Sequence, residues 1–162
     1  MNEQTIALEK CLDACQEIEE IASQIYHYHA DQFADNDKIA RLWRKTALEE
    51  ENHARQVVLA KKIATSISDT NLNVGQTEST LNLIRTLFEA IKKSPPRLEE
   101  AIRTAILFEE TLAQFHMDNA LLFEEKGIAG LFKALMMHDR KHMQELESAL
   151  EIYLPSGYLK GL

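Results

Sequence analysis

Helix-breaking residues are rare in this chain, and their positions divide it into long segments. The first 74 of the 162 residues contain neither glycine nor proline. The five glycines and three prolines all lie further along the chain, at Gly75, Gly127, Gly130, Gly157, Gly161, Pro95, Pro96 and Pro155. Because both residues disfavour helix interiors and favour turns, this distribution predicts long helices separated by few connections.

Apolar side chains recur at steps of three and four in five segments, which is typical of amphipathic helices. We predict long helices at about 3–34, 37–67, 97–125 and 131–154, and a shorter helix at about 78–93. Asp37 is the predicted N-cap of the second segment. Residues 68–77 are predicted to form a polar loop, and Gly127 and Gly130 a short turn. No segment alternates with a period of two, so the predicted fold class is all-α.

The lengths of the connections predict the architecture. Short connections join the first two long helices and the last two, so each pair forms an antiparallel hairpin. A longer connection, residues 68–96, carries the short helix from one hairpin to the other. We therefore predict an antiparallel four-helix bundle with one crossover, a single domain over 1–162 and a C-terminal tail at 155–162. The crossover helix would cover a flank of the bundle or make a contact in a homodimer.

Composition excludes several classes of protein. The chain carries 26 Asp and Glu against 18 Lys and Arg, a net charge of −8, which opposes binding to nucleic acid phosphates. It has no apolar run long enough for a transmembrane helix and no visible secretory signal, so we expect a soluble, cytoplasmic protein without a membrane partner. Its two cysteines, Cys11 and Cys15, cannot build a disulfide framework, and we expect them to be small core residues.

Charged residues interrupt the apolar stripes of all four long helices. Six of them share the inward phase: Glu19, Glu50, His53, Glu109, Asp139 and His142. Residues three apart on a helix project side by side, so Glu50 with His53, and Asp139 with His142, can each offer two ligands to one point. Four buried carboxylates without enough inward Lys or Arg need neutralisation, which two divalent cations would supply.

The same residues recur at a nearly constant offset. Glu109 follows Glu19 by 90 residues, and Asp139 follows Glu50 by 89. His142 likewise follows His53 by 89 residues. Further pairs at this offset are Tyr26 with His116, Ala22 with Leu112, Ile25 with Phe115, and Trp43 with Phe132. This repetition predicts one helical hairpin used twice, with a pseudo-two-fold axis through a dimetal site.

These motifs resemble the rubrerythrin-like branch of the ferritin-like superfamily. The resemblance lies in Glu19-x-x-Ala-x-x-Ile-Tyr26, Glu50-x-x-His53, Glu109-x-x-Leu-x-x-Phe and Asp139-x-x-His142, and it covers about three quarters of the chain. It implies a ferritin-like bundle whose Glu50 and Asp139 bridge two metal ions. Glu19 and Glu109 would be terminal ligands, and His53 and His142 would each bind one metal.

The chain also departs from the family pattern. Asp139 stands where a longer Glu is usual, so we expect either an asymmetric bridge or metals that are held differently. Leu112 occupies the position of an additional ligand-donating Glu, and His116 stands where the first repeat has Tyr26. No rubredoxin-like pair of Cys-x-x-Cys motifs is present, so electrons would have to come from a separate donor.

Two further inward residues have two interpretations each. His116 is either a hydrogen-bonded interior histidine or a proton carrier near the metals. Tyr26 is either a core residue or a hydroxyl beside the metal of Glu19. His27, His29 and His138 are predicted to be surface or boundary residues that could line a metal entry.

The predicted function is that of a non-haem dimetal protein. The resemblance implies two iron ions, with manganese or zinc as other possibilities, and oxidoreductase chemistry on peroxide or dioxygen. A metal-binding protein for iron or manganese handling or sensing, without significant turnover, is the alternative, and a structural bundle that has lost its metal is a third. Ligand type alone does not distinguish these functions.

Overall fold

The computed structural model describes residues 3–64, 74–123 and 125–153, and all of its regular structure is helical. The helices are α1 (Glu3–Gln32), α2 (Asp37–Ala64), α3 (Val74–Lys93), α4 (Leu98–Leu122) and α5 (Lys126–Tyr153). The predicted all-α class is confirmed. The predicted tail at 155–162, the end of the second helix at 65–67 and most of the predicted 68–77 loop lie outside the described residues.

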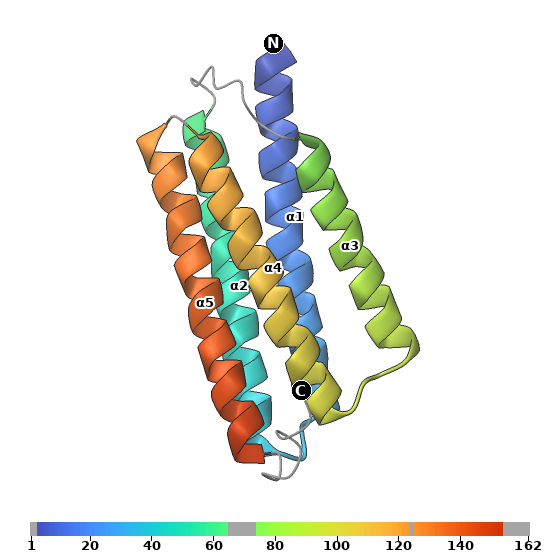
Figure 1. Cartoon of the computed structure of the whole chain (residues 1–162). Coiled ribbons are helices and arrows are strands. Elements are labelled where there is room, and N and C mark those ends of the chain that lie inside the picture. Colours follow the sequence, from blue (N-terminus) through green and yellow to red (C-terminus); the bar gives the residue numbers. More distant parts are fainter. Residues whose placement is uncertain (1–2, 65–73, 124, 154–162) are drawn as a thin grey trace.

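The helices form two antiparallel hairpins, as the connection lengths predicted. Helix α1 packs along α2, α4 packs along α5, and α2 and α5 contact each other where the hairpins meet. The crossover helix α3 runs beside α1 on the outside of the four-helix bundle, which Figure 1 shows. The structure therefore shows α3 covering a flank of the bundle, one of its two predicted roles.

Helix α3 is held to α1 by one apolar face and by polar contacts. Its buried residues are Thr77, Leu81, Ile84 and Ile91. The guanidinium of Arg85 donates from Nε to the Glu17 carboxylate at 2.9 Å. The helix starts at Val74, four residues before the predicted Glu78, because buried Thr77 extends the apolar face by one turn and its hydroxyl lies 3.4 Å from the Cys11 sulfur.

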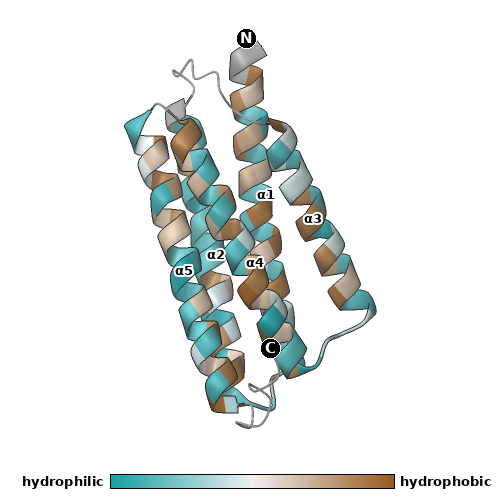
Figure 2. Ribbon diagram, in the orientation of Figure 1, coloured by the Kyte–Doolittle hydropathy of each residue, from teal (hydrophilic) through white to brown (hydrophobic). Residues whose placement is uncertain are grey.

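Hydrophobic and polar residues share every helix, and Figure 2 shows both colours along each ribbon. The hydrophobic residues gather in one core that includes Trp43, Tyr26 and Phe132, all completely buried. Among the described helices, none is long and apolar enough to cross a membrane.

Two aromatic pairs, one in each hairpin, lie at positions that the sequence offset relates. The Tyr26 ring stacks on Trp43 with centroids 5.6 Å apart. The equivalent rings, His116 and Phe132, lie 5.9 Å apart. Rings at equivalent positions are thus in contact in both hairpins, which supports the repeat that the sequence predicted.

The start of α2 differs from the prediction by one residue. The N-cap is Asn36 instead of Asp37, because the Asn36 side chain accepts a hydrogen bond from the backbone N–H of Ile39 at 3.2 Å. Asp37 lies in the first turn of the helix, where its carboxylate is 3.7 Å from Arg41. A carboxylate there also complements the positive end of the helix dipole.

The predicted glycine turn before the last helix is wrong. Gly127 and Gly130 both lie inside α5, which starts at Lys126 instead of Leu131. The Glu125 carboxylate caps this start by accepting a hydrogen bond from the backbone N–H of Ile128 at 2.7 Å. The helix α4 ends instead before Phe123. The backbone of Phe123 is extended, and its ring stacks on Phe132. Burial of these apolar rings fixes the turn more strongly than the two glycines do.

Candidate metal centre

All six predicted ligands lie in the middle of the bundle and are completely or almost completely buried. Helix α1 supplies Glu19, α4 supplies Glu109, and α2 and α5 each supply an acid and a histidine one turn apart. The exposed fraction is at most 1% for every one of the six side chains: Glu19, Glu50, His53, Glu109, Asp139 and His142. Residues from all four bundle helices therefore converge on one interior volume.

Their oxygen and nitrogen atoms form two groups with the spacing that a metal ion needs. The four-residue group contains Glu50, Glu109, Asp139 and His142, and the three-residue group contains Glu19, Glu50 and His53. In each group one potential ligand atom per residue lies within 4.8 Å of every other. Glu50 belongs to both groups, so its carboxylate could bridge two ions.

The two oxygens of Glu50 face opposite sides of the centre. Oε2 lies 2.7 Å from Nδ1 of His53, and Oε1 lies 2.9 Å from Nδ1 of His142. Asp139, in contrast, belongs to the four-residue group alone. The resemblance implied two bridging carboxylates, and the geometry gives this shared position to Glu50 only.

The other three carboxylates each turn one oxygen outward to a buried partner. The Tyr26 hydroxyl donates a hydrogen bond to Oε1 of Glu109. His116 lies between the remaining two, with Nε2 at 2.8 Å from Glu19 and Nδ1 at 2.7 Å from Asp139. The sequence placed Tyr26 beside Glu19, and the structure places its hydroxyl on the carboxylate of the opposite hairpin instead.

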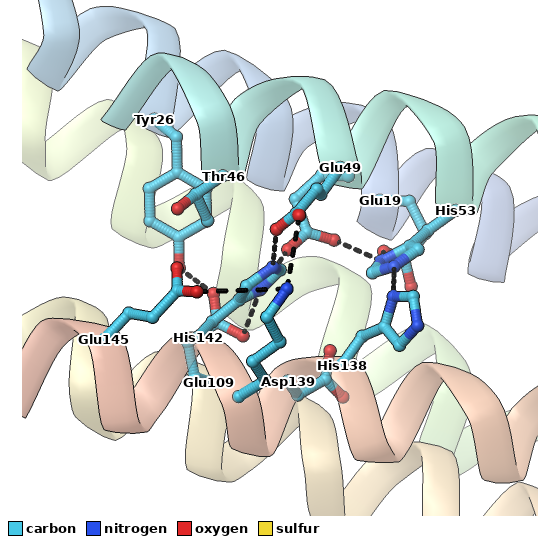
Figure 3. Close-up of polar contacts among 12 residues, drawn as sticks. Glu19, Tyr26, Thr46, Glu49, His53, Glu109, His138, Asp139, His142 and Glu145 are labelled. Carbon is cyan, nitrogen blue, oxygen red and sulfur yellow. Dashed lines mark hydrogen bonds and ion pairs between the residues drawn. The ribbon is translucent and has the colours of Figure 1, made fainter. Parts of the chain in front are cut away.

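A second layer of contacts, which the sequence did not predict, lies outside the two ligand histidines (Figure 3). Glu49 accepts a hydrogen bond from Nε2 of His142 at 2.7 Å. Nδ1 of His138 lies 2.9 Å from Nε2 of His53. Glu49 and His138 precede Glu50 and Asp139 by one residue, so the 89-residue offset could have revealed them as an equivalent pair.

The carboxylates raise the basicity of all three buried histidines in the centre. Burial lowers the pKa of His53, but hydrogen bonds to Glu19 and Glu50 outweigh burial and raise it to about 10. Burial also lowers the pKa of His142, but hydrogen bonds to Glu109 and Glu50 outweigh it and raise this pKa to about 11. Burial also opposes the charge on His116, yet Asp139 and Glu19 hold its pKa well above the usual range.

Burial has the opposite effect on the acids. It raises the pKa of Glu50 to about 7, despite hydrogen bonds from both histidines that lower it. Burial likewise raises the pKa values of Glu109 and Asp139. Glu19 differs, because His116 and His53 outweigh its burial and lower its pKa. Protons on the histidines thus offset the carboxylate charge in the metal-free protein.

The donor set fits a pair of divalent cations. Among the described residues, the buried Oδ1 of Asp139 has no hydrogen-bond partner. Buried polar atoms normally have one, so this oxygen is available to a ligand. Oε1 of Glu19 and Oε1 of Glu50 lie beside histidine nitrogens at 2.8 and 2.9 Å, and a cation could replace the protons there. Carboxylates and imidazoles are typical ligands of iron and manganese, and zinc also accepts them.

The remaining histidines and the cysteines lie outside the two groups. His27 is partly exposed and contacts Glu51 at 2.9 Å, as a boundary residue would. His29 was predicted at the surface or boundary, and this is wrong, because it is 1% exposed and packs against Trp43 and Phe33. Cys11 and Cys15 are buried free thiols in the core, as predicted.

Comparison with known proteins identifies the family. A family model described as rubrerythrin matches residues 10–150, which include most of each bundle helix and every residue of both groups. No curated protein and no solved structure matches the chain. The match spans most of the sequence and agrees with the helical bundle and the buried acid–histidine cluster. The chain therefore belongs to the rubrerythrin family.

Proposed function

We propose that this protein binds two metal ions, most simply iron, and acts as an oxidoreductase on peroxide or dioxygen. The observation that carries the proposal is the pair of buried ligand groups that share Glu50, in a chain of the rubrerythrin family. Two divalent ions would neutralise the four carboxylates that the groups contain. Flexible carboxylate and imidazole donors favour iron or manganese over the softer metals.

In this proposal each group holds one ion. Glu109, Asp139 and His142 would hold one ion and Glu19 and His53 the other, with Glu50 available to both. His53 and His142 would have to release the protons on their ligating nitrogens when metal binds, because only a deprotonated imidazole nitrogen can act as a ligand. Tyr26 fixes the orientation of Glu109 through its hydroxyl.

Reduction of peroxide to two waters needs two electrons and two protons. The reduced iron pair would supply the electrons. His116 is suited to hold a proton, because it lies between Glu19 and Asp139 and its pKa is raised well above its usual value. A separate donor would then return electrons to the centre, since the 162 residues contain no Cys-x-x-Cys motif that could hold an electron-transfer metal.

Metal binding without significant turnover is the second candidate. The observation that favours it is Leu112, which is fully buried in the core where the family pattern has a ligand-donating Glu. An apolar side chain there cannot move onto a metal when its oxidation state changes. Such a protein would hold iron or manganese for handling or sensing.

Metal analysis followed by peroxide addition distinguishes the two candidates. After anaerobic loading with ferrous iron, we expect two metal ions per chain and rapid consumption of added peroxide. Two bound ions that leave peroxide unchanged would support the binding protein. No bound metal would refute both functions and support a structural bundle.

Removal of the shared carboxylate tests the ligand assignment. We expect Glu50→Ala to lose metal from both groups, because Glu50 is the residue they share. Glu51→Ala is the matched control, since Glu51 is the next residue on α2 and contacts His27 and Arg55 instead. Full metal occupancy in Glu50→Ala would contradict the bridging role.

A further inference from the structure

The outer partners of the two ligand histidines differ in chemistry, although they occupy equivalent positions. Glu49 and His138 are 89 residues apart, the same offset that relates His53 to His142. Each contacts Nε2 of the ligand histidine from the opposite hairpin: Glu49 contacts His142, and His138 contacts His53. One histidine is therefore backed by a carboxylate and the other by an imidazole.

The carboxylate prepares His142 for a metal in a way that the imidazole cannot match. A carboxylate only accepts hydrogen bonds, so Glu49 fixes the remaining proton of His142 on Nε2 and leaves Nδ1 free to bind the ion. Its negative charge also strengthens the imidazole as a donor. His138 can either donate or accept, so it does not impose one tautomer on His53.

The number of ligands also favours the group that contains His142. The four-residue group has Asp139 as an additional carboxylate, whereas the three-residue group has only Glu19, His53 and the shared Glu50. His116 contacts one carboxylate of each group, Glu19 and Asp139, so it does not favour either group. Ligand count, charge and outer partner therefore all favour the four-residue group.

We propose that the two groups bind metal in a fixed order, with the four-residue group first and the three-residue group second. Glu49 and His138 are positioning residues in this proposal, because they act through His142 and His53 without touching the ion. The proposal rests on the dimetal function proposed above and adds an intermediate state with one ion bound. It holds whether or not the loaded protein consumes peroxide.

Titration of the metal-free protein with Mn²⁺ tests this order. Isothermal calorimetry gives the two dissociation constants, and electron paramagnetic resonance separates an isolated ion from an exchange-coupled pair. We expect two steps at least tenfold apart in Kd, with the isolated-ion signal at one equivalent and the coupled signal at two. A coupled signal from the first additions, or two steps of equal affinity, would overturn the proposal.

Ligand variants assign each step to a group. His142→Gln should remove the tighter step, and His53→Gln should leave the tighter step at its wild-type Kd. The opposite pattern would place the first ion in the three-residue group and refute the proposed order. If neither step appears even in the wild-type protein, the dimetal function itself fails, which is a distinct outcome.

Exchanging the outer partners tests their role. We expect Glu49→Gln to weaken the tighter step about tenfold, the lower end of the range for such partners, and to leave the weaker step unchanged. His138→Glu would give both ligand histidines a carboxylate partner, so it should tighten the weaker step by a similar factor.

The controls separate an effect on one group from a general effect of charge. Glu51→Gln removes a neighbouring charge that contacts His27, and it should change neither step. His138→Gln removes the partner's ring without adding a charge, and the tighter step should stay the same. Equal weakening of both steps by Glu49→Gln would show a general electrostatic effect and overturn the assignment of Glu49 to His142.

Discussion

At the residue scale, His116 joins the carboxylate of Glu19 on α1 to that of Asp139 on α5 in the metal-free protein. It is completely buried and lies within 2.8 Å of two carboxylates. Loss of its positive charge would remove the ion-pair partner of Asp139 and would leave Glu19 with His53 alone. Breaking a buried ion pair from one side costs about 3–5 kcal/mol, more than most single substitutions.

We therefore predict that His116→Gln destabilises the metal-free protein by about 3 kcal/mol. Urea unfolding in the presence of a chelator measures this change in the free energy of unfolding. His27→Gln is the control, because His27 is partly exposed and its pair with Glu51 should contribute less than about 1 kcal/mol. Equal stability of the two variants would show that His116 does not neutralise the carboxylates.

The Tyr26 hydroxyl has a separable effect on Glu109. Tyr26→Phe keeps the ring that stacks on Trp43 but removes the donor to Glu109. We expect metal affinity in the four-residue group to fall about tenfold, because Glu109 loses the contact that orients it. Mn²⁺ titration measures this change, and Tyr28→Phe, whose ring packs against Phe88, should bind as the wild type does. An unchanged affinity in Tyr26→Phe would make Tyr26 a core residue only.

At the scale of the helix, the start of α5 contains a glycine that the fold does not require. A Cβ atom at Gly130 would meet no other atom within 4 Å, and no described glycine has a positive φ. We predict that Gly130→Ala stabilises the protein by about 0.5–1 kcal/mol, because alanine is the better helix former. Thermal and urea unfolding measure the gain.

Gly127 is the matched comparison within the same turn of α5. A Cβ atom there would lie 3.0 Å from Oε2 of Glu125, the oxygen that caps the helix at Ile128. We expect Gly127→Ala to stabilise less than Gly130→Ala, because the cap must move to make room. A larger gain at Gly127 would mean that the Glu125 cap contributes little to the start of α5.

The helices and the ligand set could be predicted because both depend on local spacing. Glu50 and His53 share a helical face whatever the rest of the chain does, and the offset to Asp139 and His142 gave independent support. The start of α5 was missed because glycine propensity is a small term compared with burial of Ile128 and Phe132.

Contacts between the hairpins could not be predicted in the same way. Glu49 and His138 lie beside inward residues, and their side chains are accessible from outside, so their phase indicated surface positions. Their partners come from the other hairpin, and only the packing of α2 against α5 decides which atoms meet. The same reason applies to Tyr26, whose hydroxyl contacts Glu109 across the bundle.

At the scale of the whole molecule, the buried centre makes the stability of the metal-free protein depend on pH. The folded pKa values of His53 and His142 are about 10 and 11, above the usual value of 6.5. A histidine whose pKa is higher in the folded than in the unfolded protein stabilises the fold most at a pH below its unfolded pKa. This stabilisation is lost as the pH rises through its folded pKa. The pKa of Glu50 is raised to about 7, so deprotonation of this carboxyl also lowers the stability of the fold as the pH rises toward 7.

We therefore predict that the Tm of the metal-free protein falls as the pH rises from 7 to 10. The metal-loaded protein should show a smaller decrease, because bound cations take the place of the protons. Thermal unfolding with and without a chelator at each pH makes the comparison. A Tm that stays constant or rises over this range without metal would contradict the protonated histidines.

Because the hairpin is repeated, equivalent positions in its two copies can be compared within one molecule. Tyr26 and His116 occupy equivalent positions in the two hairpins, and so do Trp43 and Phe132. Both members of each equivalent pair belong to one chain and are measured under the same conditions. A phenol contacts Glu109 in one half, and an imidazole contacts the equivalent Glu19 in the other. Every substitution in one hairpin has a reference position 89 or 90 residues away, so the difference between two chemistries at one geometry can be measured inside a single protein.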